Sequence, residues 1–285
     1  MNSDTAYMEG ALGRPGRWAG LAGTAYGDPA AGGRPLLLLH GLTFDRRMWD
    51  PIAAALPAGQ AALALDLPGH GRSPALECHH MEEVVDAVHE AVLYAGMDRP
   101  ILVGHSISGV AATLYAATHP AAGVVNVDGP LFPPEPFVRT ARAAAPRLRG
   151  DRFHRAWSVF QNHMRIDRVP EPQRAHLAAT YDAEPRQVLS YWAELLDGEA
   201  DHTVAAICNR TDAMLDRVRR ACVPYVGLFG RVVSPGDRAW LQERVPHAQV
   251  LSWPVGHHFP HLADPARFVA LLSGMAAALP ARCAA

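Results

Sequence analysis

A serine lies at a predicted sharp turn in the stretch Gly104-His105-Ser106-Ile107-Ser108-Gly109. Three apolar residues, 101–103, lead into the turn, and an alanine-rich segment follows it as far as residue 118. This pattern predicts a strand, a tight turn and a helix, which would expose the Ser106 hydroxyl at the helix N-terminus. A serine hydroxyl is a poor nucleophile at neutral pH, so such chemistry needs a base within hydrogen-bonding distance.

Histidines near the C-terminus are the candidate bases. His257 and His258 are neighbours in the stretch Gly256-His257-His258-Phe259-Pro260, and His261 follows shortly after. Neighbouring side chains in a loop point apart, so only one of His257 and His258 can reach Ser106. In a nucleophile–acid–base chain order, either histidine would stand in the last place.

A carboxylate is also required, because it must hold the imidazole in the right tautomer and stabilise its positive charge. Asp128 follows the apolar run 123–127, which reads as a strand, and Asp237 lies further along at a predicted helix N-cap. Capping alone would explain Asp237. We therefore favour Asp128 and keep Asp237 as the alternative.

The elements that must position these residues alternate between short buried strands and helices. Apolar runs at 35–39, 61–65, 101–104, 123–128, 223–229 and 249–253 are the expected strands. Such alternation predicts a parallel sheet with helices on both faces. Ligands bind beyond the carboxyl ends of these strands, so His40, Ser106, Asp128 and the histidines near 257 are expected at one edge.

The strand rhythm breaks over residues 130–221, where a Pro-rich segment, 130–136, is followed by helical patterns at 153–164, 172–180, 185–196 and 201–218. We expect a core domain of residues 1–129 and 222–285 and a helical cap of residues 130–221. Apolar side chains of the cap are the expected substrate contacts, although aromatic residues at helical spacing also form a cap's own core. They are Leu131, Phe132, Trp157, Phe160, Met164, Tyr191 and Trp192.

Composition, charge and motif content limit the classes of partner and cofactor that we expect this chain to bind. The 285-residue chain has 49% hydrophobic residues and a net charge of −2, so nothing favours nucleic acid or an anionic membrane surface. No apolar run approaches the roughly 20 residues of a spanning helix. The N-terminal residues show no signal-peptide pattern, which predicts a cytoplasmic protein. No metal-ligand spacing or phosphate-binding loop is present, so we expect no metal and no cofactor. The oligomeric state is not readable.

Four motifs in register resemble the α/β-hydrolase superfamily over nearly the whole chain. They are His40-Gly41, the stretch Asp66-Leu67-Pro68-Gly69-His70-Gly71-Arg72-Ser73, Gly104-His105-Ser106, and Gly256-His257-His258-Phe259-Pro260-His261-Leu262-Ala263-Asp264-Pro265. The resemblance implies an eight-stranded, mostly parallel sheet with a helical cap inserted after the sixth strand. It further implies an oxyanion hole made by the backbone N–H groups of Leu42 and Ile107.

The resemblance also bears on the base and the acid. His-Phe-Pro followed by Asp-Pro at the start of the last helix favours His258 over His257. Most relatives carry an aspartate after the seventh strand, where this chain has Val233. A subset, including some haloalkane dehalogenases and zearalenone-type lactone hydrolases, carries the acid after the sixth strand, which corresponds to Asp128.

The function expected from these residues is a serine hydrolase that cleaves a carboxylic ester or lactone of a small apolar substrate through an acyl-enzyme. The same constellation supports hydrolysis of a C–C bond in a β-diketone or ring-cleavage product. A non-catalytic ligand receptor with this fold is the third alternative, and Val233 in place of the usual acid is its best support.

Overall fold

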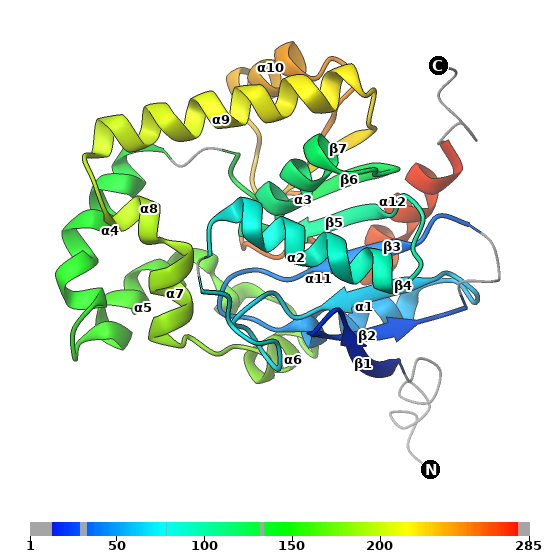
Figure 1. Cartoon of the computed structure of the whole chain (residues 1–285), viewed down its shortest axis with the longest axis horizontal. Helices are drawn as coiled ribbons and strands as arrows, with labels where there is room; N and C mark the ends of the chain where they lie inside the picture. The colour runs from blue at the N-terminus through cyan, green and yellow to red at the C-terminus, as the bar shows by residue number, and fades with distance from the viewer. Residues whose placement is uncertain (1–12, 29–32, 78, 132–133, 279–285) are drawn as a thin grey trace.

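Eight strands form one sheet in the order β1-β2-β4-β3-β5-β6-β7-β8 (Figure 1). The computed structural model describes residues 13–28, 33–77, 79–131 and 134–278. The pairs β1–β2 and β2–β4 are antiparallel, and the other five pairs are parallel. The predicted eight-stranded, mostly parallel sheet is therefore confirmed. The strands are β1 (Arg14–Trp18), β2 (Leu21–Tyr26), β3 (Leu36–Leu39), β4 (Ala62–Leu65), β5 (Ile101–His105), β6 (Gly123–Val127), β7 (Tyr225–Phe229) and β8 (Gln249–Ser252).

Helices cover both faces of the sheet, as the continuous apolar strands require. One face packs against α2 (Met81–Tyr94), α3 (Ile107–Thr118) and α10 (Pro235–Arg244). The other packs against α1 (Asp50–Ala55), which follows a 3₁₀ turn η2 (Arg46–Trp49), and against α11 (Pro260–Ala263) and α12 (Pro265–Ala278). No helix among the described residues combines the length and apolar composition needed to cross a membrane.

Between β6 and β7 the described part of the chain contains helices and no strand. Figure 1 shows α4, α5, α7 and α8 gathered at one end of the molecule and α6 nearer its middle, with α9 running back along α3 toward β7. The helices are α4 (Glu135–Leu148), α5 (Phe153–Met164), α6 (Gln173–Ala179), α7 (Pro185–Tyr191), α8 (Ala193–Leu196) and α9 (Ala200–Arg220), with a 3₁₀ turn η3 (Ile166–Arg168). Helix α9 packs in the same core cluster as α3, through Met214, Leu215 and Val218. The division of cap from core at residue 221 therefore stays a prediction.

Helix α4 is the main element that the sequence did not indicate. Its first turn lies in the segment 130–136, where proline favours a loop. Pro134 is the N-cap residue and Pro136 lies in the first turn, where the missing N–H has no intrahelical acceptor to lose. Pro146 lies near the end of the helix. The prolines are thus placed where a helix tolerates them, except for Pro146.

A buried ion pair fixes the loop between β4 and α2. Arg46 donates to Asp66 through its backbone N–H (2.8 Å) and through its guanidinium (2.5 Å). The Arg72 N–H also donates to the Asp66 carboxylate (2.8 Å), and the Ser73 hydroxyl donates to the Asp66 carbonyl (2.7 Å). Gly71 passes so close that an added Cβ would lie 2.4 Å from Asp66 Oδ2.

Asp66→Ala is expected to lower the free energy of unfolding by about 3–5 kcal/mol, because it leaves the buried Arg46 charge without its partner. The Asp66 side chain is fully buried and that of Arg46 is 10% exposed. Urea denaturation measures the change. Asp197→Ala is the matched control. Its pair with Arg149 is solvent-exposed and should contribute less than about 1 kcal/mol. Equal losses in the two variants would contradict the assignment.

Candidate active site

The turn at Ser106 is a sharp bend that only small neighbours permit. Ser106 has φ 56° and ψ −123°, outside the regions that L-residues favour. A Cβ on Gly104 would lie 1.9 Å from the Ser108 carbonyl oxygen, and one on Gly109 would lie 2.1 Å from Asn126 Oδ1. The strand-to-turn-to-helix arrangement predicted from the sequence is present. Strain of this kind is tolerated where the surrounding structure fixes it.

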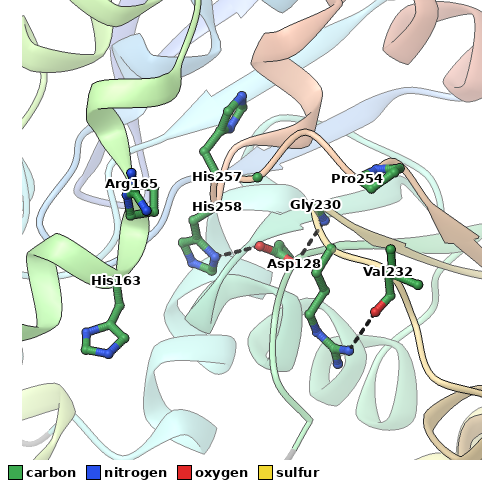
Figure 2. Close-up of a pocket in the computed structure, with 10 residues that line it drawn as sticks. Asp128, His163, Arg165, Gly230, Val232, Pro254, His257 and His258 are labelled. Atoms are coloured by element: carbon green, nitrogen blue, oxygen red, sulfur yellow. Dashed lines mark hydrogen bonds and ion pairs between the residues drawn. The ribbon is translucent and has the colours of Figure 1, made fainter.

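Asp128 and His258 meet at the same edge of the sheet. His258 Nδ1 lies 2.7 Å from Asp128 Oδ2, and Asp128 Oδ1 accepts a hydrogen bond from the Gly230 N–H at 3.2 Å (Figure 2). The two side chains are 21% and 14% exposed. Asp128 also has a left-handed backbone, with φ 53°. The carboxylate therefore holds one nitrogen of the His258 ring and leaves the other, Nε2, for a second partner.

A buried asparagine, Asn126, fixes the turn that carries Asp128. Its side-chain oxygen accepts from the Gly129 N–H (2.9 Å), and its amide donates to the Gly129 carbonyl and to the Tyr225 hydroxyl (both 3.1 Å). The same hydroxyl lies 3.0 Å from Thr113 Oγ1 of α3. The sequence analysis assigned Asn126 no role. Its signal was a polar residue inside an otherwise apolar buried strand, which usually has partners.

The His258 backbone is held from two sides. Its N–H donates to the carbonyl of Met164 in α5 (3.0 Å), and its carbonyl lies 2.9 Å from His105 Nε2. A carbonyl can only accept, so His105 carries its proton on Nε2. Burial, followed by the nearby His258 and His261 rings, holds the pKa of His105 well below its usual value. His105 is thus a neutral donor next to Ser106.

Two backbone N–H groups in and near the Ser106 turn have no acceptor among the described residues. Within the described part of the chain, neither Leu42 nor Ile107 donates its N–H to another residue. Gly41 brings the loop after β3 close, since a Cβ there would lie 3.3 Å from Ser106 Cβ. Next to Leu42, Thr43 has φ 68° and its carbonyl accepts from the cap residue Asp182 (2.8 Å). These donors suit a developing oxyanion.

Among the described residues, no hydrogen bond joins the Ser106 hydroxyl to the His258 ring. Catalytic hydrogen bonds are often long in unliganded enzymes and tighten when substrate binds. The His105 and His258 ring centroids are 4.8 Å apart, and His105 is the chain neighbour of Ser106. The loop that carries His258 and the turn that carries Ser106 are therefore packed together.

His257 and Asp237, the alternative candidates for base and acid, have other partners than the Asp128–His258 pair. His257 accepts from the Phe259 N–H (3.2 Å), so its ring is bound to its own loop, and burial lowers its pKa. The expectation that Asp237 caps α10 is wrong, because Ser234 is the N-cap and accepts from the Asp237 N–H. Asp237 instead pairs with Arg231 (2.9 Å) at the surface. Val233 packs in the core.

A model of the alpha/beta hydrolase family matches residues 36–271. The chain belongs to this family. It is 28% identical over 253 residues to a 2-succinyl-6-hydroxy-2,4-cyclohexadiene-1-carboxylate synthase of Serratia proteamaculans, covering 84% of this chain and 92% of that protein. It is 24% identical over 257 residues to a pimeloyl-(acyl-carrier protein) methyl ester esterase of Citrobacter koseri, covering 84% and 93%.

A solved structure of an esterase from Exiguobacterium antarcticum superposes on this alpha/beta hydrolase with a TM-score of 0.71. The two chains are 15% identical, and the match covers 94% of this chain and all of the other. At this level of identity the likeness shows the fold alone.

Only some of the cap residues expected at the site gather there. Trp157, Phe160 and Trp192 form one cluster with the buried Leu42, and Ile107 packs against it. Phe137 of the unpredicted α4 belongs to the same group, with its ring centroid 5.5 Å from that of Trp192. Helices α4 and α5, together with Trp192, therefore pack an aromatic layer against Leu42 and Ile107.

Leu131 and Met164 pack in other clusters. Leu131 packs in the core cluster near α9, and its carbonyl accepts from Thr211 (2.7 Å). Tyr191 packs against both the aromatic cluster and this core cluster, and its hydroxyl donates to the Pro68 carbonyl (3.0 Å). Met164 packs against the opposite core cluster, and its main-chain carbonyl contacts His258. Phe132 lies outside the described residues.

His105→Phe is expected to slow labelling of Ser106 by a fluorophosphonate about fivefold. The change removes the donor to the His258 carbonyl, a hydrogen bond of about 1 kcal/mol, and retains a ring against Phe259, whose centroid is 4.9 Å away. His105→Gln keeps a donor near the Nε2 position and should recover most of the rate. The labelling rates of the two variants are compared at a temperature well below the midpoint of thermal unfolding of each. Equal rates in the two variants would show that the hydrogen bond does not position His258.

Proposed function

We propose that this chain is a serine hydrolase that cleaves a carboxylic ester or lactone, with Ser106 as nucleophile, His258 as base and Asp128 as acid. The observation that carries the proposal is the 2.7 Å contact between Asp128 Oδ2 and His258 Nδ1. It lies at the sheet edge that also holds the strained Ser106 turn and the N–H groups of Leu42 and Ile107.

The proposed reaction has two halves. Ser106 Oγ attacks the carbonyl carbon while its proton passes to His258 Nε2, and the oxygen that becomes negative accepts from the Leu42 and Ile107 N–H groups. The tetrahedral intermediate collapses, the C–O bond to the leaving alcohol breaks, and His258 gives the proton to that alcohol. Water then repeats the sequence and releases the acid. Asp128 stays ionised and stabilises the imidazolium throughout.

An apolar part of the substrate fits the aromatic layer of the cap. Trp157, Phe160 and Trp192 pack beside Leu42 and Ile107, so a chain bound through its carbonyl would run along apolar side chains. The Citrobacter koseri relative is named a methyl ester esterase, which supports an ester bond as the target. Lactone cleavage requires the same groups and stays the second form of this proposal.

A second candidate reaction is cleavage of a C–C bond by the same residues. The Serratia proteamaculans relative is named a synthase and not an esterase, so relatives indicate targets other than an ester bond. Attack by Ser106 gives an acyl group on the serine from an ester and from a β-diketone alike. Product analysis distinguishes the two, because an ester releases an alcohol and a β-diketone releases a ketone.

A fluorophosphonate probe should label wild-type protein at Ser106, and Ser106→Ala should abolish both labelling and ester turnover. The reason is that no other described serine combines the strained turn with the Asp128–His258 pair. Labelling is read by mass spectrometry and turnover with p-nitrophenyl esters. Ester turnover that persists in Ser106→Ala would exclude the proposed function.

Asp128→Asn should lower kcat by about 10⁴, as loss of the correct imidazole tautomer does in a serine triad. Asp237→Asn is the matched control, because Asp237 pairs with Arg231 at the surface, and kcat should change little. Steady-state kinetics of both variants on one ester provide the comparison. The reverse ranking would assign the acid to Asp237.

A further inference from the structure

A hollow of about 400 Å³ borders the Asp128–His258 pair on the side where the cap meets the core. Figure 2 shows His163 and Arg165, at the end of α5, across from His258 and Asp128. The remaining lining comes from the loops after β7 and β8: Gly230, Arg231, Val232, Pro254, Gly256 and His257. Its size is in the range of small-molecule sites, and its lining differs from the aromatic layer near Leu42.

Guanidinium groups are the dominant charges around this hollow. Arg165 and Arg231 line it, and Arg168 Nη1 lies 3.2 Å from the position that a Cβ on Gly256 would take. Within the described residues, the Arg168 side chain forms no hydrogen bond or ion pair. A planar guanidinium matches a carboxylate with two parallel hydrogen bonds.

The aspartates that pair with these arginines leave the guanidinium groups available to bind a ligand in the hollow. Asp167 pairs with Arg165 (3.2 Å) and Asp237 with Arg231 (2.9 Å), but their side chains are 68% and 47% exposed. Exposed pairs of this kind contribute little and exchange readily. Asp128 is different, because both of its oxygens are already bound, one by His258 and one by the Gly230 N–H.

The backbone of Arg165 supports a role for its side chain. Arg165 ends α5 with φ 51° and ψ 46°, a left-handed conformation that glycine or asparagine normally supplies. Thr43, Ser106 and Asp128 of the candidate site also have positive φ, as do Ala19, Arg99 and Cys222 elsewhere in the described chain. Glycine would end the helix without strain, whereas arginine also places a cation at the hollow. Strained residues of this kind cluster at functional sites.

We propose that the hollow is a carboxylate subsite, so that the preferred ester carries a second, free carboxylate group. This inference rests on the proposed ester hydrolysis and names its substrate class. Arg165, Arg168 and Arg231 bind the carboxylate, while the ester carbonyl lies at Ser106 and the chain between them contacts the cap. The sequence alone led us to expect a wholly apolar substrate.

The test compares hemi-methyl esters of linear dicarboxylic acids with the dimethyl esters of the same acids, over a series of chain lengths. Wild-type kcat/KM should favour the hemi-ester at one length or more. In Arg165→Met and Arg231→Met, the ratio of kcat/KM for the hemi-ester to that for the dimethyl ester should fall at least about tenfold, as loss of a charge-assisted hydrogen bond predicts. Most of the fall should be in KM.

Arg210→Met is the matched control, since Arg210 of α9 forms a half-exposed ion pair with Glu194 and does not line the hollow. Its ratio should match that of wild type. A wild-type preference for the dimethyl ester, or an unchanged ratio in both arginine variants, would overturn the subsite and leave the proposed hydrolysis standing. If neither ester is cleaved, titration calorimetry with the free dicarboxylates decides the subsite alone. Binding that weakens in Arg165→Met and not in Arg210→Met supports it, and equal or absent binding rejects it.

Discussion

The close approach of the Ser106 turn to the end of β6 is the constraint on which the site depends. The Ser106 N–H donates to the Val127 carbonyl (2.9 Å), and a Cβ on Gly129 would lie 2.4 Å from the Ser106 carbonyl oxygen. Side chains at Gly109 or Gly129 would push the two turns apart. Because Asn126 fills the space between them with satisfied hydrogen bonds, the proposed nucleophile and acid belong to one packed unit.

The proposed base is held differently, by contacts that converge from separate elements. Gly230 lets the end of β7 lie close to the loop that carries His258, since a Cβ on Gly230 would lie 2.3 Å from the His257 carbonyl oxygen. His105 and the Met164 carbonyl then fix the His258 main chain from the core and from the cap. The cap also binds the loop after β3 through Asp182 and Thr43. A shift of the cap would therefore disturb both the base and the proposed oxyanion donors.

Local patterns predicted the sheet and the turn at Ser106, because both depend on short-range features of the chain. Asp128 was favoured from its place after a strand, and His258 was favoured over His257 by the resemblance of its stretch to the α/β-hydrolase motif. The structure brings these two side chains together. Residues that act through their main chain could not be found in this way, since the Met164 carbonyl has no sequence signal. The packing of Leu131 in the core cluster had no sequence signal either, since an apolar residue in a loop can face the core or a ligand.

The position of the acid and the charge of the hollow are connected. In this chain the segment after β7 supplies no carboxylate to the base, and Val233 turns into the core. The neighbouring Arg231 lies at the edge of the hollow, 56% exposed, where it is bound to a surface aspartate and to main-chain oxygen and lies 5.5 Å from the centre of the Phe229 ring. Asp128 reaches His258 from β6 through a left-handed turn. With Asp128 as the proposed acid, the loop after β7 is free to contribute Arg231 to the proposed subsite, and Arg165 lines the same hollow from the end of α5. A site built to polarise one carbonyl can in this way also select the charge of the chain attached to it.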